Sequence, residues 1–215
     1  MTAPAGLLDE LERDALTELV NIGVSRAASN LRKMVGGEVL LSVPSIEIID
    51  HRHAATLIHE REGGGLVAVR QDFSGAFHGS ALLIFPQANG LELVRAVLGD
   101  AVPEAEAVGM EEEALSETGN VILNSCLATM ANMLERPLAM SLPKVVRIEG
   151  EELLETVDPA EDGLVLFLYI NFSVRERSIR GYIAMVMDLV SLATLKRLVG
   201  DFIERVMRDD VDHVA

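Results

Sequence analysis

Residues 18–23 read Glu-Leu-Val-Asn-Ile-Gly, and residues 117–122 read Glu-Thr-Gly-Asn-Val-Ile, so Glu and Asn recur at one spacing after a shift of 99 residues. The same shift places Ser42 and Pro44 on Ser141 and Pro143. Two further matches follow in the same order, at shifts of 102 and 101 residues: 79–85 with 181–187, and 93–99 with 194–200. Because the four matches occur in the same order, the sequence indicates an internal duplication, with two copies of one structural unit.

Apolar spacing predicts the same order of elements in each unit. The first unit has a long helix, a strand, a short polar segment, a hairpin and a closing helix, at residues 7–34, 38–49, 52–60, 66–73 with 76–85, and 87–98. The second unit repeats them at 110–134, 138–148, 151–156, 164–172 with 178–187, and 189–207. Pro44 and Pro143 lie inside the first strand of each unit, which indicates an edge or a bulge because proline donates no ladder hydrogen bond.

Three strands per unit cannot bury both faces of a small sheet alone. We therefore expect an α/β (α+β) fold in which two helix–strand–strand–strand–helix units share one mixed sheet about a pseudo-twofold axis, with both long helices packed on one face. The prediction is a single domain over residues 1–215, made of repeats at about 7–99 and 107–207 and joined by the acidic stretch around Pro103.

Composition excludes several classes of protein. The net charge of −16 argues against a nucleic-acid partner, because phosphate contacts need clustered Lys and Arg. No apolar run approaches the ~20 residues of a membrane span, and the N-terminus lacks the pattern of a signal peptide. The single cysteine, Cys126, rules out an internal disulfide and fits a reducing compartment. We therefore expect a cytoplasmic protein without membrane insertion.

Each long helix carries a polar ridge at helical spacing. Asp14, Glu18 and Asn21 share one face of the first helix, and the second helix repeats the ridge with Glu113, Glu117 and Asn120. A polar stripe on an amphipathic helix is usually only its solvated face. Asn, however, is a poor residue for a helix interior, and its recurrence at equivalent positions favours a function.

The pattern of Asp or Ser, three residues, Glu, two residues and Asn resembles the signature of the CheC, CheX and FliY phosphatases. Two copies in one chain resemble CheC rather than CheX, which has one copy and acts as a dimer. The resemblance extends to the flanking Val43-Pro44 and Leu142-Pro143. Glu113 departs from it, since the family has Asp or Ser at that place.

The resemblance implies a phosphatase that removes phosphate from the aspartate of the response regulator CheY. By this resemblance Asn21 and Asn120 position the attacking water, Glu18 and Glu117 pair with a lysine of the regulator, and Asp14 and Glu113 support docking. The chain then needs no cofactor of its own, because the regulator supplies Mg²⁺. The deamidase CheD is a further implied partner. Two alternatives remain: a non-catalytic adaptor that binds CheY or CheD, and a flagellar switch component.

Other polar or reactive groups carry weaker signals. His51, His53 and His59 lack a Cys or carboxylate partner at the spacing of a zinc site. The glycines at 63–65 lack the Gly-Lys-Ser/Thr ending of a phosphate loop and predict a turn. Cys126 lies on an amphipathic helix, where a buried, inert thiol is expected.

Overall fold

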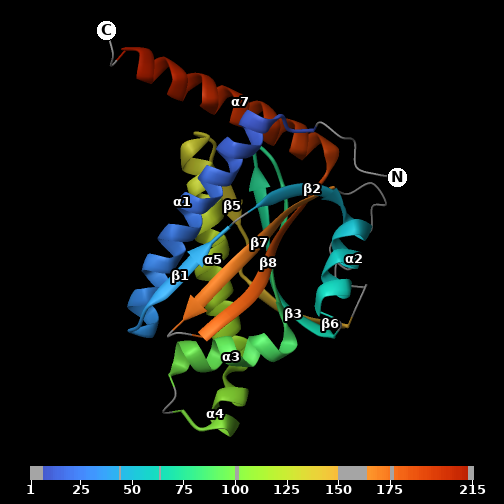
Figure 1. The fold of residues 1–215 in the computed structure, drawn as a ribbon, viewed down its shortest axis with the longest axis vertical. Coiled ribbons are helices and arrows are strands. Elements are labelled where there is room, and N and C mark those ends of the chain that lie inside the picture. Colours follow the sequence, from blue (N-terminus) through green and yellow to red (C-terminus); the bar gives the residue numbers. More distant parts are fainter. Residues whose placement is uncertain are drawn as a thin grey trace.

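The structure, a computed structural model, describes residues 7–43, 45–62, 64–99, 102–149, 164–174 and 177–212. In chain order the elements are α1 (Glu10–Val35), β1 (Val39–Ser42), β2 (Ile46–Asp50), α2 (His51–Glu62), β3 (Gly65–Gly75), β4 (Gly79–Pro86), α3 (Gln87–Leu98), α4 (Glu104–Gly109), α5 (Glu111–Met133), β5 (Leu138–Met140), β6 (Lys144–Glu149), β7 (Leu164–Val174), β8 (Arg177–Met187) and α7 (Leu189–Asp212). Figure 1 shows this order by colour. The predicted element order is confirmed, except that the segment at 151–156 lies outside the described residues.

Two predicted strands are each divided into a pair of shorter ones. The strand expected at 38–49 is β1 and β2, and the strand expected at 138–148 is β5 and β6. The breaks fall at 43–45 and 141–143, where the two prolines stand, because proline cannot donate to a ladder. The joining stretch also contains a short helix, α4, that the sequence pattern did not predict.

The two halves of the chain share one sheet, as predicted. Its strand order is β1-β7-β8-β4-β3-β5, with β2 also paired to β7 and β6 also paired to β3. Strands β1 and β2 of the first half thus pair with β7 of the second half, and strands β5 and β6 of the second half pair with β3 of the first. The expectation of a mixed sheet is wrong, because every described pairing is antiparallel. Within each half, a hairpin pairs β3 with β4 or β7 with β8 in antiparallel fashion. The pseudo-twofold axis relates the two central strands, β4 and β8, so these also run in opposite directions.

The register of the outer strands follows the 99-residue shift. Val39 lies opposite Val174, and Leu138 lies opposite Gly75, so the two exchanged pairings are the same pairing after that shift. In the hairpins, the second strand of the second unit is displaced by one further residue. Val69 lies opposite Leu83, and Leu168, which is 99 residues after Val69, lies opposite Ile183. Strands β4 and β8 therefore correspond at a shift of 100 (Leu83 to Ile183), not at the 102 of the sequence match. Leu83 also pairs with Ile183, which places the pseudo-twofold axis there.

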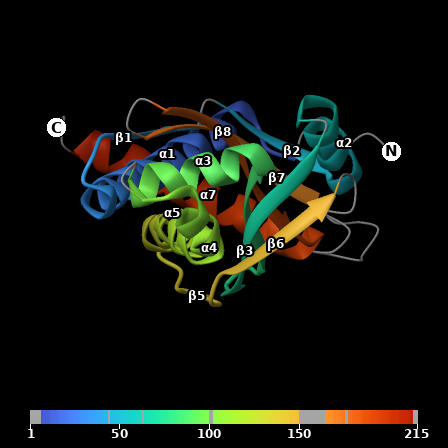
Figure 2. The ribbon, with the colours of Figure 1, turned by 90° about the horizontal axis from the view of Figure 1, so that it is seen from below.

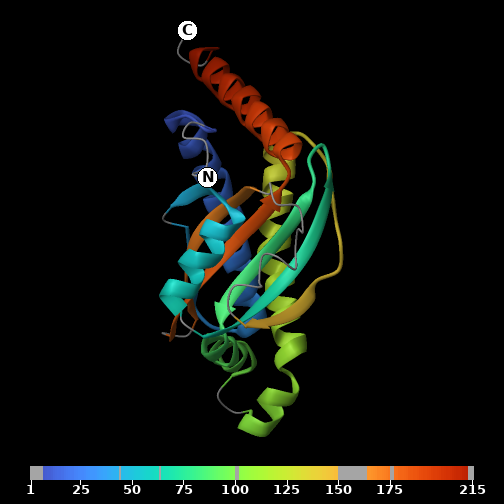
Figure 3. The ribbon, with the colours of Figure 1, turned by 90° about the vertical axis from the view of Figure 1, so that its right-hand side faces the viewer.

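Helices cover the two faces of the sheet unequally. The long helices α1 and α5 pack side by side on one face over the larger core, to which α3 and α7 also contribute. α2 covers the other face over a smaller core, and Figure 3 shows it on the side of the sheet away from α5. In Figures 1 and 2, α3 and α4 lie at one end of the long helices and α7 crosses the other end. Within the described ranges, no helix combines the length and apolar content of a bilayer span.

A close approach of backbones sets the spacing of α1 and α5. A Cβ on Gly23 of α1 would lie 2.8 Å from the Cα of Cys126 and 3.2 Å from the carbonyl oxygen of Ser125. Only glycine leaves room for this crossing. The crossing holds both polar ridges in one rigid layer.

We predict that Gly23→Ala lowers the free energy of unfolding by about 1–3 kcal/mol, because the added methyl forces the two helices apart. Gly200→Ala in α7 is the matched control, since nothing lies within 4 Å of its Cβ position. That variant should gain up to about 1 kcal/mol, alanine being the better helix former. Urea unfolding followed by circular dichroism measures both. Equal stabilisation by the two alanines would contradict the tight crossing.

Candidate functional site

The two ridges keep the arrangement that helical spacing predicts. On α1, Asp14 and Glu18 are exposed and Asn21 is half-buried; on α5, Glu113 and Glu117 are exposed and Asn120 is half-buried. Neither asparagine is buried against the sheet. No ion pair or hydrogen bond between described side chains engages the four carboxylates. The ridges therefore present free negative charge beside two carboxamides, which suits a partner with a cationic group.

Both ends of the Asn21 carboxamide are bound to the chain between β1 and β2. Its Oδ1 accepts from the backbone N–H of Val43 at 3.0 Å, and its Nδ2 donates to the Val43 carbonyl at 3.2 Å. Val43 is buried, so Asn21 satisfies backbone groups that water does not reach. This asparagine therefore has a structural role, and its oxygen and one of its two amide N–H groups are engaged.

The Asn120 carboxamide is bound at its oxygen only. Oδ1 accepts from Nδ2 of Asn124 at 2.6 Å and from Nε2 of Gln71 at 3.3 Å. Gln71 comes from β3 and is buried, and its Nε2 also donates to the Ser141 carbonyl at 2.9 Å. Among the described residues, the Nδ2 of Asn120 has no partner. An amide N–H donor thus remains available on this ridge.

Sequence reasoning missed Gln71, although a signal was present. Residues 67, 69, 71 and 73 of β3 point to one side of the sheet and read Val, Val, Gln and Phe. A single amide in an otherwise apolar row predicts a buried hydrogen-bonding role. What the sequence could not identify is its partners, which lie on α5 and in the loop after β5.

The loops beside the two asparagines also differ. Leu142, which follows Ser141, is 83% exposed, whereas Val43 at the matching position of the first unit is 3% exposed. The first loop thus turns inward onto Asn21. The second loop leaves an apolar side chain in solvent close to the Asn120 ridge.

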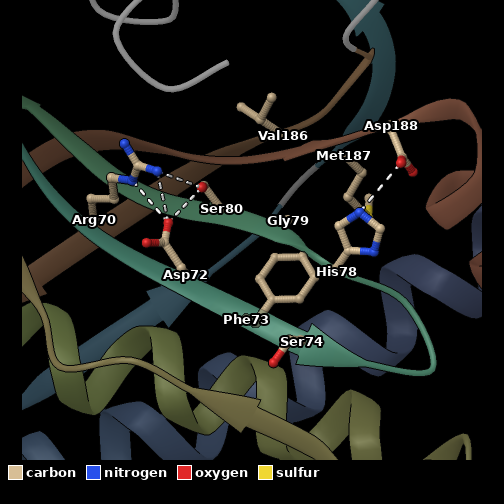
Figure 4. A pocket seen from close by; sticks show the side chains of 10 residues that line it. All are labelled: Arg70, Asp72, Phe73, Ser74, His78, Gly79, Ser80, Val186, Met187 and Asp188. Carbon is tan, nitrogen blue, oxygen red and sulfur yellow. Dashed lines mark hydrogen bonds and ion pairs between the residues drawn. The ribbon is translucent and has the colours of Figure 1, made fainter. Parts of the chain in front are cut away.

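A cavity of about 670 Å³ lies away from both ridges (Figure 4). Its charged groups are paired within its own wall: Asp72 accepts from Arg70 at 2.9 Å and from Ser80 at 2.6 Å, and His78 lies 3.3 Å from Asp188. Partial burial opposes ionisation of Asp72, but the Ser80 and Arg70 hydrogen bonds outweigh it and lower the pKa of that carboxyl. Asp72 and Gln71 point to opposite faces of the sheet, since side chains alternate along a strand. None of the predicted site residues lines this cavity.

Neither a metal centre nor a reactive thiol emerges from the described part of the chain. No group of three or more His, Cys, Asp or Glu side chains in it could hold a metal ion. Cys126 is fully buried at the helix crossing, and burial raises the pKa of its thiol to about 12. The polar ridges are therefore the best candidates for a functional site.

Comparisons with known proteins find chemotaxis phosphatases and flagellar switch proteins. The sequence model of the chemotaxis phosphatase CheX family matches residues 67–163, a range that contains Gln71, Glu117 and Asn120. The CheY-P phosphatase CheC of Bacillus subtilis is 24% identical over 199 residues, 87% of this chain and 93% of that protein. Thermotoga maritima FliY superposes with a TM-score of 0.71, at 17% identity over 91% of this chain and 98% of that one. The FliM middle domain from H. pylori gives a TM-score of 0.60, at 9% identity over 89% and 99% of the chains. At these identities, the two solved structures show a shared fold.

The contacts of Asn21 predict a cost to stability that is independent of any activity. Asn21→Ala leaves the buried N–H of Val43 unpaired, so the free energy of unfolding should fall by about 1–3 kcal/mol. Glu18→Ala, one turn away and exposed, is the control and should change it by no more than about 0.5 kcal/mol. Denaturant titration of both variants checks this. A fully stable Asn21→Ala protein would remove the structural role of that amide.

Proposed function

We propose that the chain hydrolyses the aspartyl phosphate of a CheY-type response regulator, because it is similar to the CheC, CheX and FliY phosphatases. One observation carries the proposal: a Glu and an Asn recur one turn apart on two exposed ridges, and on the second ridge the amide N–H groups have no partner among the described residues. The likeness to CheC over most of both chains supports the same reaction.

The proposed chemistry is positioning rather than proton abstraction. Hydrolysis of a phosphoryl group requires a water in line with the bond that breaks, and its loose transition state needs no strong base. The Nδ2 of Asn120 can donate to one lone pair of that water and leave the other free to attack phosphorus. Its Oδ1 is already occupied, so the amide nitrogen is the group that acts.

The two sites are not equivalent in this proposal. The Asn21 amide nitrogen has two N–H groups, and one of them is committed to the Val43 carbonyl. Neither N–H group of Asn120 has a partner among the described residues. We therefore assign the larger share of activity to the second site, and a smaller share to the first.

The acidic residues would dock the regulator. Glu18 and Glu117, with Asp14 and Glu113 beside them, have exposed carboxylates that no described side chain engages, and these can pair with a lysine near the phosphorylated aspartate. In this proposal Mg²⁺ comes with the regulator, and the chain supplies no cofactor. A CheD-like partner stays a prediction.

We predict that Asn120→Ala removes most of the phosphatase activity, since loss of one preorganised donor costs on the order of a hundredfold at its site. Asn21→Ala should remove a smaller share, and the double variant should be nearly inactive. The measurement is the decay of phosphorylated CheY with each variant, with folding checked by circular dichroism. Wild-type rates in a folded double variant would reject hydrolysis and favour a non-catalytic adaptor.

Changes at the glutamates should act on binding as well as turnover. Glu117→Ala is expected to raise KM about threefold to tenfold, as for loss of a partly desolvated ion pair. Added salt should weaken binding of the wild-type protein more than of this variant, because salt screens the lost pair. Glu112→Ala, an exposed acid one residue before Glu113, is the control. An unchanged KM for Glu117→Ala would exclude the docking role.

A further inference from the structure

Gln71 is a buried amide at a position where the fold does not require one. It is 1% exposed, and its Oε1 has no hydrogen-bond partner among the described residues. The matching position of the second unit, 99 residues later on β7, holds Ile170, which is 2% exposed. Two equivalent strand positions thus carry an amide in one half and an aliphatic side chain in the other.

Burial of this amide is unfavourable for stability. A buried polar atom without a partner costs about 1–3 kcal/mol, and Ile170 proves that the strand accepts an aliphatic group in the same place. The presence of an amide at position 71 must therefore be explained by contacts local to that position. The hydrogen bonds of Gln71 show which contacts these are.

All of its donor contacts converge on the Asn120 ridge and the adjoining loop. Nε2 lies 3.3 Å from Oδ1 of Asn120, 3.3 Å from Oδ1 of Asn124 and 2.9 Å from the Ser141 carbonyl. Asn124 in turn donates to Oδ1 of Asn120 at 2.6 Å. Nε2 carries two N–H groups, so one can serve the Ser141 carbonyl while the other is shared between the oxygens of Asn120 and Asn124. The Asn120 oxygen therefore lies within hydrogen-bonding distance of two amide nitrogens, those of Gln71 and Asn124.

We propose that Gln71 is a positioning residue that orients the carboxamide of Asn120 so that its Nδ2, and not its Oδ1, faces the reacting phosphoryl group. This inference rests on the proposed function. The χ2 torsion of asparagine has a broad and nearly twofold distribution. Without restraint, the carboxamide can therefore rotate so that either its nitrogen or its oxygen faces a given point. Gln71 and Asn124 together hold one orientation.

The first site lacks this device. Ile170 has no donor to offer, and the Asn21 carboxamide is held by the Val43 backbone instead. The effect of Gln71 should consequently be confined to the second site. A purely structural glutamine, in contrast, would affect both sites through the shared sheet.

The test replaces Gln71 with methionine, which has a similar volume and no N–H donor. Gln71→Met is combined with Asn21→Ala, which leaves the second site alone, and separately with Asn120→Ala, which leaves the first. Ile170→Met in the same two backgrounds is the matched control. Each protein is assayed for kcat and KM with a phosphorylated CheY-type regulator, and for thermal unfolding.

In the Asn21→Ala background, Gln71→Met should lower kcat about tenfold or more, as small misplacements of a catalytic group do, with KM changed less than twofold. In the Asn120→Ala background it should change neither constant. Equal losses in both backgrounds, or a loss matched by Ile170→Met, would overturn the inference in favour of a structural role. An unchanged kcat in the Asn21→Ala background would also overturn it.

A second measurement separates this inference from the proposed function. With ¹⁵N-labelled asparagine, the Asn120 side-chain amide of the otherwise wild-type protein should show one sharp pair of resonances, and Gln71→Met should broaden or shift them. An unaltered pair would reject the positioning role whatever the activity. If the wild-type protein leaves phosphorylated CheY intact while the resonances respond as expected, the proposed function fails and the orientation of Asn120 by Gln71 stands.

Discussion

The antiparallel pairing of β4 with β8 at the pseudo-twofold axis is the constraint on which the rest of the structure depends. Leu83 meets its own counterpart Ile183 there, so each half of the chain completes the sheet of the other. The exchange of the outer strands reinforces this dependence, because β7 is covered on its outer edge by β1 and β2, and β3 by β5 and β6. Neither half can satisfy its backbone hydrogen bonds alone. The long helices are thereby brought together on one face and meet at Gly23 and Cys126.

A symmetric frame of this kind makes differences between the halves informative. Equivalent positions on the strands and helices share a place in the fold, so a difference in side chain or in burial between them indicates a difference in local role. Gln71 against Ile170, and Leu142 against Val43, are two such differences, and both lie beside the asparagine ridges. The Asn21 carboxamide is bound to its loop through both its oxygen and its nitrogen, whereas the Asn120 carboxamide is bound at its oxygen only and the loop beside it exposes an apolar side chain. The divergence supports unequal roles for the two ridges in the proposed reaction.

Much of the fold could be predicted because it rests on local patterns. The helices carry apolar residues at three- and four-residue spacing, and the observed α1 and α5 begin and end within a few residues of the predicted bounds. The duplication also predicted a shared sheet. The direction of the strands and the one-residue offset of the hairpins were not predictable, since pairing between distant strands leaves no periodic trace in either strand. The match at a shift of 102 was misleading because apolar strands resemble one another at any even offset.

For the site, the sequence by itself determined which side chains share a helix face. Asp14, Glu18 and Asn21 must lie together, as must Glu113, Glu117 and Asn120, because 3.6 residues per turn leaves no alternative once the helices form. Only the tertiary structure decided what each carboxamide does. Val43 is 22 residues from Asn21, and Gln71 is 49 residues from Asn120. Hydrogen bonds over such separations are set by how strands and loops pack against the helix. The same spacing of Glu and Asn therefore yields one asparagine whose oxygen and nitrogen are both bound to the backbone and one that is bound at its oxygen only.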